Sequence, residues 1–236
     1  MTASLAHDDY TVAWICALSL EAAAAKAMLD EIHDPLPQPR TDYNTYTLGK
    51  INGHNVAIAC LPCGVYGTTS AATVLAHMLP TFPSLRFGLM VGIGGGVPTG
   101  DTDIRLGDVV VCIPRDRSGG VIQYDYGKTL SGGRFQCTGS LNKPPQFLLT
   151  AVSDMRSNDF MRERPIGGII SETLQRHEEM TKQFSRPDKD WLFRSTYQHQ
   201  SNSRDCSLCD CAQLVPRSPR ASNEPHVHYG TIASGN

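Results

Sequence analysis

Residues 89–97, Leu-Met-Val-Gly-Ile-Gly-Gly-Gly-Val, and residues 106–111, Leu-Gly-Asp-Val-Val-Val, decide how this chain folds. An apolar run that ends in four glycines within five residues predicts a buried strand whose carboxyl end opens onto a ligand site. Glycines leave backbone N–H groups accessible, so a ligand can approach the main chain closely. The spacing fits neither the G-x-G-x-x-G motif that opens a helix nor the P-loop, which needs Lys and then Ser or Thr after its last glycine. A second buried strand is predicted directly after Gly107 and Asp108.

Strand and helix patterns alternate along the rest of the chain. Besides the two strands above, strands are predicted at residues 10–18, 45–50, 55–61, 124–128 and 227–233. Helices are predicted at residues 21–32, 67–79, 144–155 and 168–184. Asn52-Gly53 predicts a tight hairpin turn between two of the strands, and Pro80 is expected just beyond the end of the second helix.

This alternation predicts an α/β fold with three layers, α/β/α, around a central mixed sheet. Ligands of such folds bind at the carboxyl ends of the strands, where the glycine block falls. We expect residues 1–9 to be disordered and residues 10–236 to form one domain. Residues 185–224 are polar and rich in Ser, Arg and Pro, and they are interpreted as a long, partly disordered insertion in that domain.

Composition excludes several classes of function. The formal net charge is −2 and no Lys/Arg-rich block occurs, so no nucleic-acid partner is expected. The first ten residues lack a basic segment followed by an apolar one, and no apolar run is long enough to cross a bilayer. We therefore expect a cytoplasmic protein with no membrane partner.

The eight cysteines do not predict a disulfide framework, because the chain is large and has no secretion signal. Three of them, Cys206, Cys209 and Cys211, lie in the polar segment as Cys-x-x-Cys-x-Cys. A zinc site needs about four ligands, and the nearest additional donors in the sequence are histidines. Those histidines are His199, His226 and His228. Incidental thiols are favoured over structural zinc, so neither a metal nor a cofactor is expected.

Four blocks together resemble the nucleoside phosphorylase/nucleosidase superfamily, and specifically the phosphorylase-like domains of filamentous fungi, which often begin larger proteins. These blocks are residues 14–21, residues 63–67, the glycine block with residues 106–111, and residues 228–236. No single block is decisive, but their joint order is highly specific. The resemblance implies a phosphorylase/hydrolase-like fold. In that family the final strand is followed by a ribose-binding Glu segment and a strand with the catalytic Asp, so we expect a domain that lacks its C-terminal third.

Glu21 is the candidate catalytic residue. It stands at the start of a helix just after a strand, where a carboxylate is favoured by the helix dipole without any further function. The resemblance implies instead that Glu21 positions the attacking water. Two other polar residues have structural interpretations: Asp108, at the start of the strand after Gly107, should satisfy backbone donors there, and His228, at the start of the last strand, should pack or hydrogen-bond.

The candidate substrate-binding residues surround the same predicted strand ends. They are Gly64, Gly92, Ile93, Gly94, Gly95, Ser234 and Asn236. Gly92, Gly94 and Gly95 are expected to present backbone to a ligand. The resemblance implies that Gly64 borders the ribose or phosphate pocket, and that Ser234 and Asn236 belong to the loop that contacts the purine.

The reaction class follows from two departures from the family. The hexameric purine phosphorylases hold phosphate with an Arg and a Ser, where this chain has Met90 and Ile93. Phosphate would lose two contacts, each worth about 1.5–3 kcal/mol. We therefore expect cleavage of the N-glycosidic bond of purine nucleosides, by hydrolysis rather than phosphorolysis, in a longer form of the protein.

The alternative is a non-catalytic nucleoside-sensing or interaction domain of a larger fungal regulatory protein, inactive as this chain. A purine nucleoside is the expected partner in both cases. Homo-oligomeric assembly and additional domains in a longer chain stay open.

Overall fold

The structure is a computed structural model, and it describes residues 5–100, 102–161, 166–184, 189–199, 205–222 and 224–235. Its largest sheet has five strands in the order β2-β3-β4-β1-β5. These strands are β1 (Val12–Cys16), β2 (Glu31–Ile32), β3 (Tyr46–Ile51), β4 (His54–Cys60) and β5 (Phe87–Met90). β1 runs parallel to both β4 and β5, whereas β3 pairs antiparallel with β4 and β2 antiparallel with β3. The sheet is therefore mixed, as the sequence predicts.

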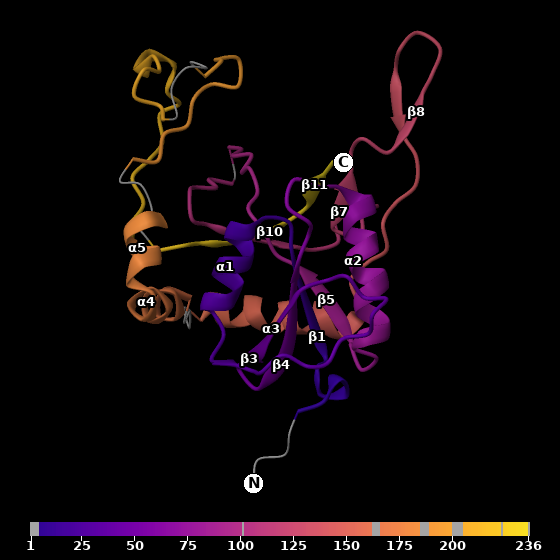
Figure 1. Ribbon diagram of the computed structural model, residues 1–236. Coiled ribbons are helices and arrows are strands. Elements are labelled where there is room, and N and C mark those ends of the chain that lie inside the picture. The colour runs from indigo at the N-terminus through magenta and orange to yellow at the C-terminus, as the bar shows by residue number, and fades with distance from the viewer. Residues whose placement is uncertain are drawn as a thin grey trace.

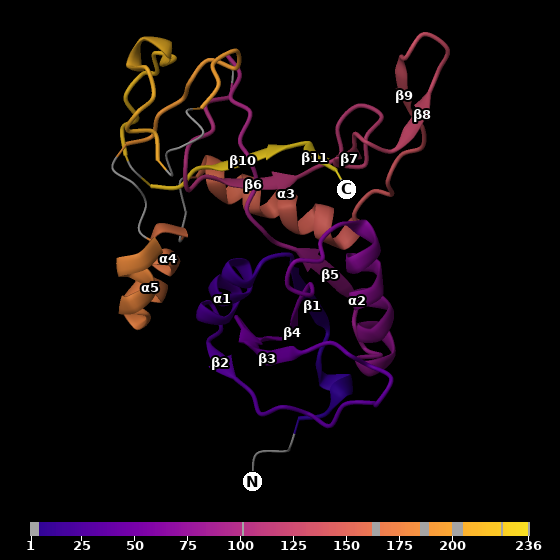
Figure 2. The same ribbon diagram turned by 45° about the horizontal axis from the view of Figure 1, so that its top comes forward.

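Two helices cover opposite faces of this sheet. α1 (Ser19–Ala27) packs on the face formed by Val12 and Cys16 of β1, and α2 (Thr68–Thr81) packs on the face formed by Ala13 and Ile15. Because side chains alternate between the faces of a strand, β1 contributes to both apolar clusters. Figures 1 and 2 show the resulting three layers, with α1 and α2 on either side of the sheet. The predicted α/β class is confirmed.

The chain beyond β5 forms three two-stranded ribbons. β6 (Val109–Cys112) pairs in parallel with β10 (Val227–Gly230), β7 (Val121–Gln123) pairs in parallel with β11 (Ile232–Ser234), and β8 (Gly127–Thr129) pairs antiparallel with β9 (Phe135–Cys137). The helices of this part are α3 (Gln146–Phe160), α4 (Ile166–Arg176) and α5 (Glu178–Phe184). Figure 2 shows the β6–β10 ribbon above α3, away from the five-stranded sheet.

α3 connects the two parts of the molecule. Near its start, the ring of Phe147 meets Phe87 of β5 edge to face, with 5.5 Å between the ring centroids. Near its end, Asp159 accepts a hydrogen bond of 2.7 Å from the Tyr229 hydroxyl of β10. The helix therefore contacts the edge strand of the large sheet and the first ribbon with different ends.

Several predicted elements differ in extent. The first helix ends at Ala27 rather than residue 32, because Glu31 and Ile32 pair with β3 as a strand. Pro80 lies inside α2, where Phe82 still donates its N–H to the Met78 carbonyl and closes the last turn beyond it. The strand predicted at 124–128 is two strands that flank a turn, and the helix predicted at 168–184 is divided between α4 and α5.

The strands expected to be buried are more exposed than the sequence predicts. Met90 of β5 is 66% exposed and Val109 of β6 is 40% exposed. Each of these strands has one neighbour in its sheet in the part of the chain that the structure describes. The last predicted strand, 227–233, is likewise divided between two ribbons and does not lie inside the central sheet.

The two segments expected to lack order contain local structure. His7–Asp9 form a short 3-10 helix, η1, within the N-terminal segment. In the polar segment, Phe193 bridges to Leu214, and Cys211–Gln213 form the 3-10 helix η2. Among the described residues, no helix is both long and apolar enough to cross a lipid bilayer.

Candidate functional site

The parallel strands β1, β4 and β5 end at the same edge of the large sheet. Three loops leave this edge: residues 17–18 enter α1, residues 61–67 enter α2, and residues 91–97 form the glycine block. β1 lies between the other two strands, and its chain turns to α1 on one face while that of β4 turns to α2 on the other. The sheet therefore places the three sequence blocks beside one another, at the kind of edge where α/β folds bind ligands.

Glu21 is the central polar residue at this edge. Ala17 and Leu18 donate their backbone N–H groups to its Oε2, each at 2.8 Å, and Ile93 donates its N–H to Oε1 at 2.7 Å. Glu21 is the third residue of α1, so the bond from Leu18 is that of a capping box. The residue is 8% exposed. Its carboxylate thus connects the end of β1 and the start of α1 to the glycine block.

This geometry limits what the Glu21 carboxylate can do. A carboxylate has about four acceptor positions. The three backbone N–H groups occupy both positions on Oε2 and one on Oε1. No other donor among the described residues reaches Oε1, which leaves one acceptor position for a water or a ligand hydroxyl.

The close contact with Glu21 leaves room only for a glycine at position 92. A Cβ atom at Gly92 would lie 2.5 Å from Glu21 Oε1, far inside van der Waals contact. At Gly96 a Cβ would lie 2.7 Å from the side chain of Ile104. By contrast, a Cβ at Gly94 or Gly95 would have nothing within 4 Å, and both residues are exposed. The glycine block therefore has two glycines that permit close packing and two that lie open at the edge of the sheet.

The other predicted binding residues divide between two places. Gly64 lies exposed in the loop after β4 with φ of +79°, a conformation that favours glycine. The Ile93 side chain is 69% exposed beside the glycine block. Ser234 lies instead in the β7–β11 ribbon, where its carbonyl accepts the N–H of Tyr124 at 3.0 Å. Asn236 lies outside the described residues.

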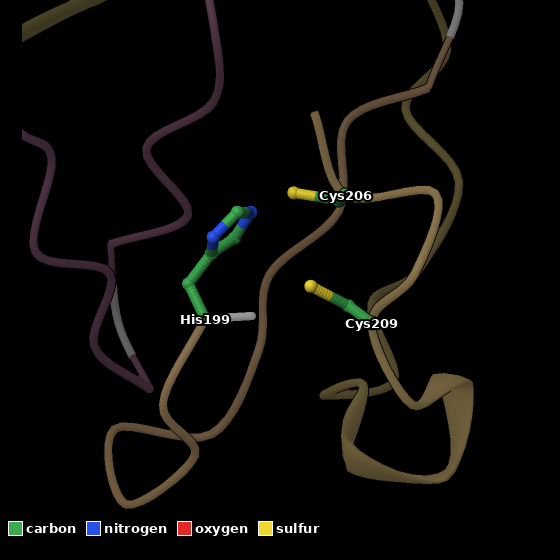
Figure 3. Close-up of side chains that lie close together, drawn as sticks. All are labelled: His199, Cys206 and Cys209. Atoms are coloured by element: carbon green, nitrogen blue, oxygen red, sulfur yellow. The ribbon is translucent and has the colours of Figure 1, made fainter. Parts of the chain in front are cut away.

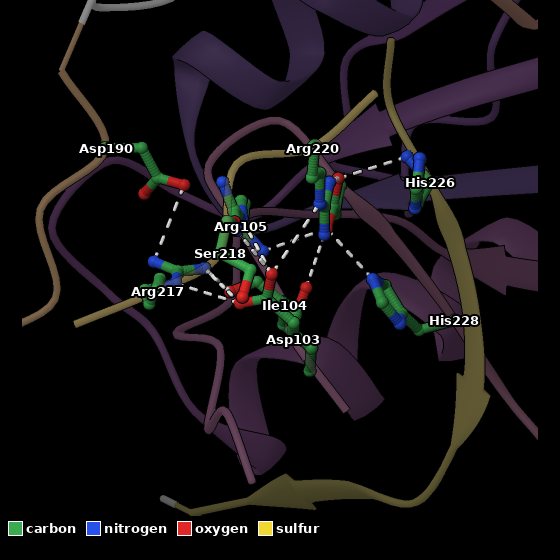
Figure 4. Close-up of polar contacts among 10 residues, drawn as sticks. Asp103, Ile104, Arg105, Asp190, Arg217, Ser218, Arg220, His226 and His228 are labelled. Atoms are coloured by element: carbon green, nitrogen blue, oxygen red, sulfur yellow. Dashed lines mark hydrogen bonds and ion pairs between the residues drawn. The ribbon is translucent and has the colours of Figure 1, made fainter. Parts of the chain in front are cut away.

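A second polar cluster surrounds Asp108 at the start of β6, and Figure 4 shows Arg220, His226 and His228, which belong to it. Arg220 donates to both carboxylate oxygens, at 2.8 and 2.6 Å. The backbone N–H groups of Arg105 and His226 donate at 2.8 and 3.0 Å, and His228 Nε2 lies 2.9 Å from Oδ2. The predicted structural roles of Asp108 and His228 are confirmed.

Burial acts to raise the pKa of the Asp108 carboxyl, but the hydrogen bonds from Arg220, His226, His228 and Arg105 outweigh it, and the pKa lies well below its usual range. The hydrogen bond to Asp108 in turn raises the pKa of Arg220. The Asp108 side chain is fully buried and is ionised in the folded protein at neutral pH.

The arginines of this cluster were not predicted from the sequence. Arg217 and Arg220 come from the polar segment and reach back more than 100 residues: Arg217 pairs with Asp103 at 2.7 Å and donates to the Ile104 carbonyl at 2.8 Å. Arg105 also pairs with Asp103, and its hydrogen bond is the main cause that lowers the pKa of that carboxyl. The spaced arginines in Pro-Arg-Ser-Pro-Arg, residues 216–220, were the available signal, but charge alone does not identify a partner.

A cavity of about 500 Å³ lies elsewhere, beside β7. The turn at Arg115–Ser118, Tyr126 and residues 137–141 contribute to its walls. None of the predicted site residues lines it. The cavity and the edge with Glu21 are therefore separate candidate sites.

Comparison with known proteins gives one informative similarity. No protein-family model matches the chain. A nucleotide-binding leucine-rich repeat (NLR)-like protein of Hyaloscypha variabilis is 47% identical over 234 residues, which cover 99% of this chain and 23% of that protein. The chain thus spans about a quarter of the length of the relative that it matches.

Proposed function

We propose that this chain is a purine-nucleoside-binding domain of the nucleoside phosphorylase/nucleosidase type, working within a larger NLR-like regulatory protein. One observation supports this most strongly: Glu21 accepts an N–H from the glycine block, while Gly94 and Gly95 lie open beside it. The loop is thereby held at the strand ends with accessible backbone, which is what recognition of a small polar ligand requires.

The residue types of the three loops favour an uncharged ligand. Residues 17–20, 61–67 and 91–97 contain no Lys or Arg, so a phosphate would meet no cationic side chain there. Val65, Tyr66 and Ile93 are all more than half exposed at the same loops. Such apolar and aromatic surface suits the face of a base, and backbone N–H groups with the free acceptor position on Glu21 suit ribose hydroxyls.

The regulatory part of the proposal rests on the similarity to the NLR-like protein. That name describes the whole relative, of which the matched region is 23%. A domain of this kind within a long chain would report ligand binding to its neighbours, without any need for turnover.

Hydrolysis of the N-glycosidic bond is the second candidate. The observation in its favour is that, among the described residues, Glu21 Oε1 accepts only the N–H of Ile93, which leaves an acceptor position for one water. Replacement of the phosphate-holding residues of the family by Met90 and Ile93 favours water over phosphate as the nucleophile.

Calorimetric titration tests the binding proposal. Adenosine, inosine and guanosine are compared with the corresponding monophosphates and with ribose. The variants Gly94→Ala and Gly95→Ala add a methyl group without an internal clash, so they should keep the melting temperature and weaken nucleoside binding at least about tenfold, or 1.4 kcal/mol. Gly168→Ala, in α4 and equally free of clashes, is the control and should bind normally. Absence of nucleoside binding, or tighter binding of the monophosphates, would contradict the proposal.

Base release, measured with and without phosphate, separates binding from hydrolysis. Hydrolysis predicts release that is independent of phosphate and that falls by about 10²–10⁴ in Glu21→Gln. Binding without release supports the sensing domain. Release that requires phosphate would exclude the hydrolytic candidate.

A further inference from the structure

The polar segment forms a small lobe, defined here as residues 189–199 and 205–222. Its stem is a short antiparallel pairing, in which Val215 donates its N–H to the Leu192 carbonyl at 2.8 Å and Arg194 donates to the Gln213 carbonyl at 3.0 Å. Phe193 bridges to Leu214 in the stem and stacks on Tyr197, with 5.4 Å between the ring centroids.

This lobe has almost no apolar core. Cys209 is its one buried residue among those that the structure describes. Segments of this size bury too little apolar surface to hold a fixed shape, and small units of this kind are usually stabilised by disulfides or a metal ion. The lobe therefore needs a stabilising contact other than hydrophobic packing.

Three potential metal ligands converge at the head of the lobe. One ligand atom from each of His199, Cys206 and Cys209 lies within 4.8 Å of the other two. Figure 3 shows the imidazole ring and both sulfur atoms turned into the same space from two passes of the chain. In a tetrahedral zinc site two sulfurs lie about 3.8 Å apart, given Zn–S bonds of about 2.3 Å. Because the two sulfurs already lie within 4.8 Å of each other, they would have to approach by at most about 1 Å.

Backbone and side-chain contacts hold these ligands in place. The N–H of Cys209 donates to the Cys206 carbonyl at 3.1 Å, in a turn that sets the two thiols side by side. His199 Nε2 lies 3.1 Å from the Asp205 carbonyl oxygen, next to Cys206. The Tyr197 hydroxyl accepts the N–H of Asp210 at 2.7 Å and joins the two passes of the chain.

We propose that His199, Cys206 and Cys209 bind one Zn²⁺ ion, with water in the fourth position, and that this ion staples the lobe. Two thiolates and an imidazole select zinc over the oxygen-preferring cations Mg²⁺ and Ca²⁺. Cys211 is not part of the cluster, although it belongs to the same Cys-x-x-Cys-x-Cys sequence. This proposal differs from the expectation of incidental thiols because the structure brings His199 to Cys206 and Cys209, which the sequence spacing alone did not define.

A bound Zn²⁺ ion would also affect how the lobe is held against the rest of the molecule. The lobe contains Arg217 and Arg220, which pair with Asp103 and Asp108. A metal that fixes the head of the lobe reduces the entropy lost when these arginines dock. Zinc binding should therefore stabilise the attachment of the lobe, independently of any nucleoside.

The test uses the whole chain under reducing conditions, with Co²⁺ as the spectroscopic probe. We expect one Co²⁺ per chain, with tetrahedral d–d bands and thiolate-to-cobalt charge transfer, and displacement by Zn²⁺. Cys206→Ser and Cys209→Ser should abolish the charge-transfer band, and His199→Ala should weaken binding at least about tenfold. Cys211→Ser is the matched control, since it makes the same chemical change two residues away and should bind Co²⁺ normally.

Limited proteolysis provides a second measurement that does not depend on the spectrum. Zn²⁺ should slow cleavage within residues 195–212 of the wild-type chain and of Cys211→Ser, but not of Cys206→Ser. Absence of charge transfer in the wild-type chain would overturn the proposal. Loss of binding in Cys211→Ser equal to that in Cys206→Ser would overturn the three-ligand assignment, and unchanged cleavage with bound metal would overturn the role as a staple.

Discussion

Different interactions stabilise the chain up to Phe82 and the chain after it: apolar packing in the first part, and polar contacts in the later part. Among the residues that the structure describes, all buried hydrophobic ones except Cys209 and Val227 lie between Tyr10 and Phe82. They form two apolar clusters, one on each face of the five-stranded sheet. The later part instead has narrow ribbons and a buried carboxylate, Asp108, that joins β6, β10 and the lobe.

This difference explains which part of the structure can be predicted from sequence patterns alone. Apolar packing is non-directional and needs only the right residue types at the right period. A buried ion pair needs particular partners in a particular geometry, and loss of one partner leaves the other desolvated. Substitutions that create cavities should therefore destabilise the first part most, and polar changes at its surface should have little effect. In the later part, changes to the buried polar contacts should destabilise most, and loss of apolar side chains should matter less.

Cavity formation in the first part should have the largest effect. Phe82 is 1% exposed and meets Tyr10 and Tyr46 edge to face. Phe82→Ala should lower the free energy of unfolding by about 3–5 kcal/mol, measured by urea denaturation. Phe135→Ala, at a ring that is 47% exposed in β9, is the comparison and should cost far less. Equal losses in the two variants would remove the distinction between the parts.

Neutralisation of Asp108 should be the largest single polar effect in the later part. Asp108→Asn removes the charge that Arg220 and His228 face, at about 1.5–3 kcal/mol for a hydrogen bond to a charged group. Hydrogen exchange should show faster opening of β6 and β10, with β1 and β4 unchanged. Asp154→Asn, on the exposed surface of α3, should leave exchange unchanged. Uniform acceleration across both parts would show that they unfold as one unit.

Gly92→Ala tests the contact between Glu21 and the glycine block. The new methyl group would clash with Glu21 Oε1, and overpacking of this kind costs about 1–3 kcal/mol. In the double variant with Glu21→Ala the clash disappears, so the two losses should be less than additive in a double-mutant cycle. Strict additivity would mean that the two residues do not contact each other.

Acid should destabilise the later part before the first part. This is the smallest of the expected effects, because it is absent near neutral pH. The pKa of Asp108 is depressed in the folded state relative to about 3.9 in an unfolded chain. Its stabilisation is therefore fully present above about pH 4 and is lost as the pH falls from there through the folded-state pKa. Hydrogen exchange of β10 should be constant from pH 7 to pH 4 after correction for intrinsic rates, and should accelerate below. Asp108→Asn should abolish this pH dependence, and its persistence there would assign the effect to another group.

Local sequence signals predicted the elements in which neighbouring residues decide the geometry. Asn52 and Gly53 both have positive φ, 45° and 84°, as the predicted tight hairpin requires. The Ala-rich run after Glu21 forms a helix, but its end at Ala27 depends on pairing of β2 with β3, which propensity cannot anticipate. The sequence correctly placed the glycine block at the end of a strand, but it did not predict that this strand, β5, is exposed.

Residue types and their period along the chain were sufficient to determine the α/β class, the hairpin, a helix that follows β1 and a glycine loop at a strand end, because these depend on local conformation and apolar burial. Only the tertiary structure joined Glu21 to Ile93, Arg220 to Asp108, and His199 to the two cysteines. Hydrogen bonds, ion pairs and metal sites act over a few ångströms between residues that are distant in sequence. Their partners are therefore selected by how the chain is folded and not by the pattern of the residues themselves.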